Sequence, residues 1–159
     1  MNTIQINNVL TKHVKHFQGV YPIDILPSTL IKQLKIFINL DKHYMPGSHW
    51  VPACFSDSGN AEYFDSFGLP PYKLEIMAYL QRLSVSWTSN RHRLQDLTTN
   101  VCAHYCCIYS LHRARGLSMT SFVKMFLPAV RTFRAQVGEC PACSQLEQSS
   151  SIRASRRYK

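Results

Sequence analysis

Four side chains in this sequence have the types and the order needed for nucleophilic catalysis by sulfur: His49, Asp65, Gln95 and Cys102. A nucleophilic cysteine needs a stabilised thiolate, a base within reach and a third group that orients the base. It also needs a hydrogen-bond donor for the oxyanion that develops on the attacked carbonyl. The four residues supply one group for each need, which predicts attack of a thiolate on a carbonyl carbon.

Cys102 is the best placed of the six cysteines. It follows a polar loop and falls in the first turn of a helix predicted over 101–115, where free amide N–H groups and the helix dipole lower the pKa of a thiol. Cys106 and Cys107 fall deeper in this helix and are interpreted as packing residues. Gln95 precedes Cys102 by seven residues, and we expect its side-chain amide to donate to the oxyanion together with the backbone N–H of Cys102.

A predicted β-hairpin brings the base and its orienting group together. His49 begins an apolar run at 49–55, Asp65 lies in a second run at 61–67, and the turn residues of 56–60 separate the two. This turn places His49 directly opposite Asp65 on the same face of the hairpin. The carboxylate is therefore expected to accept a hydrogen bond from the imidazole and to orient it.

The elements that position these residues follow from the periodicity of apolar residues and from the turn residues between them. The predicted helices cover 4–17, 28–34, 72–83, 101–115 and 118–127, the last ending before Pro128, and the predicted strands cover 36–40, 49–55, 61–67 and 84–90. Helices, then a small sheet, then further helices predict an α+β domain with a mostly antiparallel sheet packed against helices.

Length and composition fit a single globular domain. The chain has 159 residues, of which 45% are hydrophobic and 17% charged, a balance typical of a packed protein rather than a disordered one. The sequence has no apolar run of the roughly 18 residues that a membrane span requires, and its first residues do not look like a signal peptide. We therefore expect an intracellular protein of the cytoplasm or nucleus, neither secreted nor membrane-bound, with reduced cysteines.

The surroundings of the four residues resemble those in the adenovirus-type cysteine proteases, which comprise adenain and its relatives in viruses and virus-like transposons. They also share the wider pattern of the SUMO and ubiquitin-like deconjugating proteases. The resemblance covers roughly residues 17–127 and rests on the order of His, Asp, Gln and Cys. Its segments are Phe17-Gln18-Gly19-Val20-Tyr21-Pro22, Gly47-Ser48-His49-Trp50, Tyr63-Phe64-Asp65-Ser66-Phe67-Gly68, and Gln95 followed by Cys102-Ala103-His104-Tyr105-Cys106-Cys107.

The resemblance implies an adenain-like, papain-like cysteine protease fold and a role for each of the four residues. His49 corresponds to the general base, Asp65 to its orienting carboxylate, Cys102 to the nucleophile and Gln95 to the oxyanion donor. It further implies hydrolysis of peptide bonds in viral or transposon-type precursor proteins through an acyl-enzyme. We expect a polypeptide substrate, no cofactor and no bound metal.

Two positions depart from the family pattern. Ala103 stands where the family usually has Gly directly after the nucleophile, and Pro52 falls inside a predicted strand, where a proline needs an edge or a bulge. These departures leave open a catalytically decayed copy of the fold that acts as a binding module. Removal of a ubiquitin-like modifier by the same site is a further alternative.

The formal net charge is +9, from 18 Lys and Arg against 9 Asp and Glu. Part of this charge lies in a Ser- and Arg-rich C-terminal segment, so we predict a single protease-like domain at 1–144 and a basic, disordered tail at 145–159. The tail is a candidate for non-specific binding of DNA or of an acidic partner. Cys140 and Cys143 have the spacing of half a zinc site, but no matching second pair is present at zinc-finger spacing.

Overall fold

The computed structural model describes residues 1–28 and 33–136. It divides the chain into two compact units, Met1–Met125 and Phe126–Lys159. The first unit contains the sheet and every candidate site residue. The predicted tail at 145–159 lies outside the described residues, so its disorder stays a prediction.

Each predicted strand corresponds to an observed one, although the ends differ. The helices are α1 (Thr3–His13), α2 (Leu74–Leu83), α3 (Cys102–Ala114) and α4 (Met119–Gln136), and the strands are β1 (Phe17–Pro22), β2 (Lys35–Asn39), β3 (Trp50–Phe55), β4 (Asn60–Tyr63) and β5 (Ser86–Ser89). Strand β1 was not predicted, because a strand that contains Gly and Pro lacks the usual composition of β-structure.

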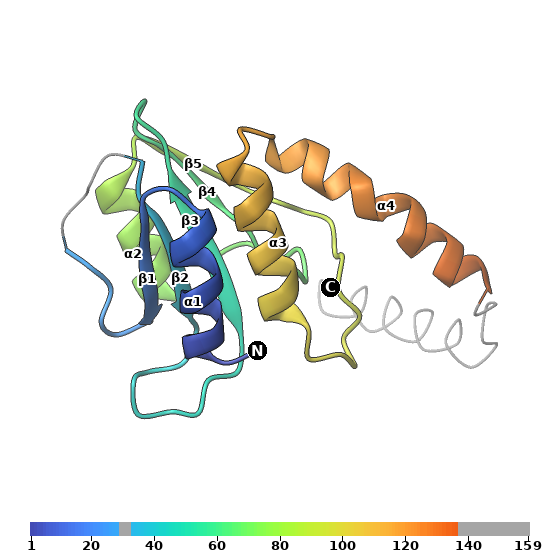
Figure 1. Ribbon diagram of the computed structural model, residues 1–159, viewed down its shortest axis with the longest axis horizontal. Helices are drawn as coiled ribbons and strands as arrows, with labels where there is room; N and C mark the ends of the chain where they lie inside the picture. The colour runs from blue at the N-terminus through green and yellow to red at the C-terminus, as the bar shows by residue number, and fades with distance from the viewer. Residues whose placement is uncertain (29–32, 137–159) are drawn as a thin grey trace, which may run out of the picture. The chain divides into compact units, whose positions relative to one another are not determined.

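The strands form one sheet in the order β1-β2-β3-β4-β5 (Figure 1). The inner pairs β2–β3 and β3–β4 are antiparallel, whereas the outer pairs β1–β2 and β4–β5 are parallel. Parallel neighbours need a crossover connection, and the segment containing α2 supplies the one between β4 and β5. The α+β class is confirmed, with a mixed sheet that is antiparallel at its centre.

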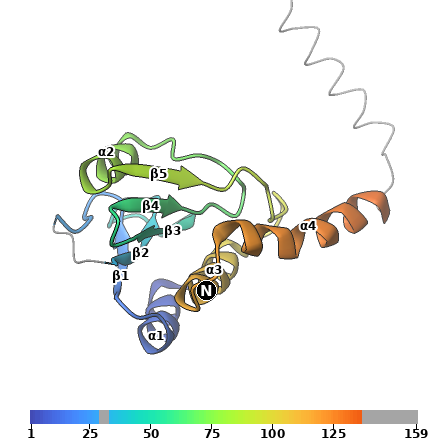
Figure 2. The ribbon, with the colours of Figure 1, turned by 90° about the horizontal axis from the view of Figure 1, so that it is seen from above.

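Helices cover both faces of the sheet. Figure 2 shows α2 on one side of the strands and α1 with α3 on the other. Because side chains alternate along a strand, Ile36 and Ile38 of β2 face the α2 side, whereas Phe37 faces the opposite side. The α2 side holds the main hydrophobic cluster, which contains Ile23, Leu34, Ile36, Ile38, Leu40, Val51, Ala53, Phe55, Ala61, Tyr63, Ile76, Tyr79, Leu80 and Leu83.

Helix α1 begins at a capping box and ends earlier than predicted. The side-chain oxygen of Asn2 accepts the backbone N–H of Gln5 at 2.9 Å, and the Gln5 side chain accepts the N–H of Asn2 in return. The helix ends at His13 rather than at Phe17, because the chain turns at His16, with φ 62°, and enters β1. Phe17 is therefore a strand residue.

Helix α4 continues through Pro128, so the predicted end before this residue is wrong. A proline removes only one backbone donor, and the helix on either side of it supplies the remaining hydrogen bonds.

The predicted helix at 28–34 falls mostly on residues outside the described part of the chain. Among the described residues, no helix is long and apolar enough to cross a membrane.

Candidate active site

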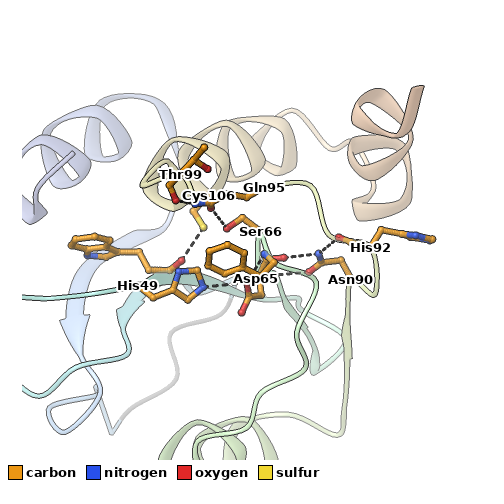
Figure 3. Close-up of polar contacts among 10 residues, drawn as sticks. His49, Asp65, Ser66, Asn90, His92, Gln95, Thr99 and Cys106 are labelled. Atoms are coloured by element: carbon orange, nitrogen blue, oxygen red, sulfur yellow. Dashed lines mark hydrogen bonds and ion pairs between the residues drawn. The ribbon is translucent and has the colours of Figure 1, made fainter. Parts of the chain in front are cut away.

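His49 and Asp65 meet at the end of the sheet, directly before β3 and shortly after β4 (Figure 3). The Nε2 atom of His49 lies 3.1 Å from Oδ1 of Asp65. The Asp65 side chain is fully buried and that of His49 is 13% exposed, so solvent ions screen the pair weakly. The ring of Phe67 lies against the imidazole, with ring centroids 5.0 Å apart. The contact expected from the hairpin is present.

The register of the hairpin differs from the predicted one by two residues. Ala53 pairs with Tyr63, whereas a position of His49 directly opposite Asp65 requires Ala53 to pair with Ala61. Because side chains alternate between faces with a period of two, the shift keeps His49 and Asp65 on the same face. The prediction of directly opposite residues is therefore wrong, and the carboxylate reaches the imidazole diagonally.

Cys102 is the first residue of α3, and only 5% of it is exposed. Burial raises the pKa of its thiol, but the imidazole of His49 and the backbone N–H groups of Trp50 and Ala103 stabilise the thiolate. The net result is a pKa below the ordinary value of 9.0. This is the environment that lowers the pKa of a cysteine at a helix N-terminus.

The imidazole of His49 shows the complementary shift. Burial lowers its pKa, but hydrogen bonding and charge from Asp65 and Cys102 raise it from 6.5 to about 9. Because Nε2 faces Asp65, Nδ1 is the ring nitrogen left for the sulfur. Nδ1 makes no hydrogen bond of ordinary geometry among the described residues, and such bonds in unliganded sites are often long and tighten when substrate binds. The two opposed shifts favour a thiolate–imidazolium pair.

An aromatic cluster holds the helix that carries Cys102 against the segment that carries Asp65. Phe64 stacks on Tyr109 of α3 with ring centroids 4.4 Å apart, and Phe122 packs edge-on against both rings at 5.3 and 5.4 Å. Aromatic pairs of this kind contribute about 0.5–1.5 kcal/mol each beyond the burial of their surface. Because Phe64 directly precedes Asp65, the cluster restricts the position of the carboxylate relative to the start of α3.

Cys106 and Cys107 are buried in α3, in agreement with their interpretation as packing residues. Burial raises the pKa of the Cys106 thiol well above its ordinary value and that of Cys107 to about 11. The Cys106 thiol donates to the backbone carbonyl oxygen of Trp50 at 3.1 Å and so restrains the residue that follows His49. Of the three cysteines of α3, only Cys102 has a lowered pKa.

Gln95 is buried between the Asp65 segment and the loop before α3 (Figure 3). Its Oε1 accepts the hydroxyl of Ser66 at 2.7 Å, and its Nε2 donates to the backbone carbonyl of Thr99 at 2.6 Å. A side-chain amide has two N–H groups, so the Thr99 carbonyl occupies one and the second is left for another acceptor. The role of Gln95 as an oxyanion donor stays a prediction.

Ser66 and Asn90 are polar residues of the site that the sequence reasoning did not single out. Both are buried, and each bonds a residue far away in the chain: Ser66 holds the side chain of Gln95, and Asn90 holds the backbone of Asp65. Neither residue stands out by spacing, because its partners come from a distant segment. Only the position of Ser66 directly after Asp65 could have indicated a role.

The two departures from the family pattern have a structural outcome. Ala103 lies within α3, where the backbone is helical and does not require glycine. Pro52 lies in β3, which is a central strand without a bulge in its pairs, so the predicted edge or bulge is wrong. The Pro52 carbonyl accepts the N–H of Phe64, just beyond the end of β4. In an antiparallel pair, the nitrogen and the carbonyl of one residue face the same neighbouring strand. The nitrogen of Pro52, which has no N–H to donate, therefore faces the position just beyond the end of β4, where the hydrogen bonds between β3 and β4 have ended.

The described residues test neither the half zinc site at Cys140 and Cys143 nor the binding role of the basic tail. Cys140, Cys143 and the basic tail lie outside them, and within them no group of three or more His, Cys, Asp or Glu side chains gathers in a way that could hold a metal ion. Binding of DNA or of an acidic partner by the tail therefore stays a prediction.

The sequence matches no family model and no curated protein. Among solved structures, the chain is similar to the ASFV pS273R protease, with a TM-score of 0.48 and 21% identity over 59% of this chain and 38% of that chain. It is similar to the C-terminal Ulp1 protease domain in complex with Smt3, the yeast orthologue of SUMO, with a TM-score of 0.46 and 13% identity over 75% and 67% of the two chains. It is also similar to the central domain of the Lpg1148 protein from Legionella pneumophila, with a TM-score of 0.44 and 16% identity over 97% and 96%. The chain thus spans 38% of the ASFV protease chain.

Proposed function

We propose that this chain is a cysteine endopeptidase in which Cys102 is the nucleophile, His49 the base and Asp65 the residue that orients the base. One observation carries the proposal: the imidazole of His49 contacts the buried carboxylate of Asp65 and interacts electrostatically with the thiol of Cys102, and the pKa shifts of imidazole and thiol are opposed. His49 and Asp65 flank the β3–β4 hairpin and Cys102 begins α3, so the site forms where the helix start packs against the hairpin.

Acylation uses the ion pair directly. The Cys102 thiolate attacks the carbonyl carbon of the scissile peptide bond, and the carbonyl oxygen becomes an oxyanion. When this intermediate collapses, the C–N bond breaks and Nδ1 of the His49 imidazolium gives its proton to the leaving nitrogen. The products of this step are a thioester on Cys102, a free amine and a neutral imidazole.

Deacylation reverses the proton transfer. Neutral His49 takes a proton from water, the resulting hydroxide attacks the thioester carbonyl, and the C–S bond breaks to release a carboxylic acid product. The thiolate and the imidazolium are thereby restored. Throughout, Asp65 accepts the Nε2–H hydrogen bond, which keeps Nδ1 directed at the reacting atoms and stabilises the imidazolium.

The oxyanion in both steps needs donors that are already in place. We assign the backbone N–H of Cys102 and the second N–H of Gln95 to this role. The hydrogen bonds to Ser66 and Thr99 support the assignment, because together they define which end of the Gln95 amide is oxygen and which is nitrogen.

The proposal is tested with a peptide that carries a thiol-reactive vinyl sulfone. We expect covalent labelling of the wild-type chain, complete loss of labelling in Cys102→Ala, and unchanged labelling in the control Cys107→Ala, which removes a buried thiol of raised pKa from the same helix. Equal labelling of the wild type and Cys102→Ala would reject the nucleophile. A folded wild type that is never labelled would support the decayed binding module instead.

We propose that the substrates are precursor polypeptides of the viral or transposon type and that the protein acts on them within the cell. The resemblance of the segments around the four residues to those of adenovirus-type cysteine proteases supports this proposal. Removal of a ubiquitin-like modifier by the same site is the alternative. Reporters with a short Gly-containing peptide and reporters with an intact ubiquitin-like modifier separate the two. Cleavage of the peptide reporters without cleavage of the modifier reporters agrees with precursor polypeptides as substrates. Cleavage that requires the folded modifier rejects this substrate class.

A further inference from the structure

Resting on the proposed function, we propose that Asn90 is a positioning residue that holds the backbone of Asp65 and thereby keeps the carboxylate against Nε2 of His49. The Oδ1 atom of Asn90 accepts the backbone N–H of Asp65 at 2.8 Å, and its Nδ2 donates to the backbone carbonyl of Asp65 at 2.6 Å (Figure 3). The same Nδ2 donates to the carbonyl of His92 at 3.2 Å. Asn90 is only 4% exposed.

The backbone of Asp65 needs such a partner because β4 ends before it. The last residue of β4 is Tyr63, so the N–H and C=O of Asp65 lack the neighbouring strand that would otherwise bond them. The C=O accepts the N–H of Gly68 in the following turn at 2.8 Å, whereas the N–H bonds the Asn90 side chain. Buried backbone groups without partners are costly. The amide of Asn90 supplies one acceptor and two donors, which replaces the missing strand at this residue. Neither a carboxylate nor an aliphatic side chain of similar size offers both functions.

The carboxylate itself has few other restraints. Its Oδ1 accepts the backbone N–H of Phe67 at 2.7 Å in addition to facing His49. Its Oδ2 is buried and has no hydrogen-bond partner among the described residues. The distance between Oδ1 and Nε2 therefore depends on where the backbone of Asp65 lies, and Asn90 bonds that backbone on both its donor and its acceptor.

A merely structural role for Asn90 and a positioning role predict different results. The titratable groups that raise the pKa of His49 are Asp65 and Cys102. If Asn90 acts through Asp65, its loss moves the pKa of His49 in the same direction as the loss of the carboxylate, and it has no further effect once the carboxylate is gone. If Asn90 only stabilises the fold, the melting temperature falls while the pKa of His49 stays where it is.

The experiment follows the imidazole signals of His49 by NMR against pH in the full chain, which requires no substrate. We expect Asn90→Leu to lower the pKa of His49 from about 9 to roughly 8, because the carboxylate of Asp65 is no longer held against Nε2. This drop is a tenfold change in the protonation equilibrium. In an Asp65→Asn background, Asn90→Leu should cause no further change. The matched control Asn60→Leu, at an exposed position in the hairpin, should leave the titration unchanged.

Each outcome has a defined meaning. An ordinary pKa for His49 in the wild type contradicts the proposed function itself. A raised pKa in the wild type that persists in Asn90→Leu, with or without a lower melting temperature, rejects the positioning role alone. If Asn90→Leu does not fold, Asn90→Ala, which removes both the donor and the acceptor without adding bulk, is titrated instead. An unchanged pKa in that variant rejects the positioning role, and a lowered one supports it.

Discussion

The ion pair between His49 and Asp65 is the contact most open to a quantitative test. Asp65→Asn removes the negative charge and keeps the size of the side chain. The rise in the pKa of His49 from 6.5 to about 9 corresponds to about 3 kcal/mol in favour of the imidazolium, at about 1.4 kcal/mol for each pKa unit. Asp65 is the larger of the two contributors to this rise. We therefore expect the substitution to remove about 2 kcal/mol of the preference for the imidazolium, which is a roughly 30-fold change in the protonation equilibrium of His49.

The assay is the rate constant for alkylation of Cys102 by iodoacetamide, measured against pH. In the wild type, the thiolate should react well below pH 9.0, the ordinary pKa of a thiol. In Asp65→Asn, we expect the rate near pH 6 to fall roughly 30-fold, because a weaker imidazolium no longer stabilises the thiolate. Asp57→Asn is the control, since it makes the same chemical change at an exposed position in the hairpin. If Asp65→Asn keeps the wild-type profile, the carboxylate does not support the ion pair and the reasoning fails.

Three further predictions concern the pH dependence, the oxyanion donor and one glycine. Because the imidazolium of His49 persists up to its pKa of about 9, kcat/KM should fall above that pH, and an alkaline limb near 6.5 instead would contradict the raised value. Ser66→Ala removes the hydrogen bond to Gln95 and should lower kcat about tenfold without changing KM; full additivity with Gln95→Ala would refute the coupling. Gly68→Ala should lower the free energy of unfolding by more than about 2 kcal/mol, because φ is +72° and the added Cβ would lie 2.6 Å from the facing backbone. Gly116→Ala, with φ +80° and no atom within 4 Å, should lose only about 1–2 kcal/mol in the same denaturation experiment, and equal losses would show that the close approach does not matter.

Local sequence determined most of the elements of this protein and the types of its site residues, although it did not predict β1. The two apolar runs on either side of the turn residues at 56–60 predict the hairpin, and the position of this turn predicts that His49 and Asp65 share a face. The face survives a register shift of two residues, which is why the contact was predicted while the exact pairing was not. The polar loop before Cys102 likewise predicts the start of α3, because a helix start is encoded within a few residues.

The tertiary structure decided everything that depends on partners far apart in the chain. The parallel pairing of β1 with β2, the aromatic cluster that fixes α3, and the bonds from Asn90 to Asp65 and from Ser66 to Gln95 all join distant segments. Periodicity reports which face of its own element a side chain occupies, but it carries no information about which other element will cover that face. The lowered pKa of Cys102 and the raised pKa of His49 belong to this second class, since burial and a neighbouring charge arise only when separate elements pack together.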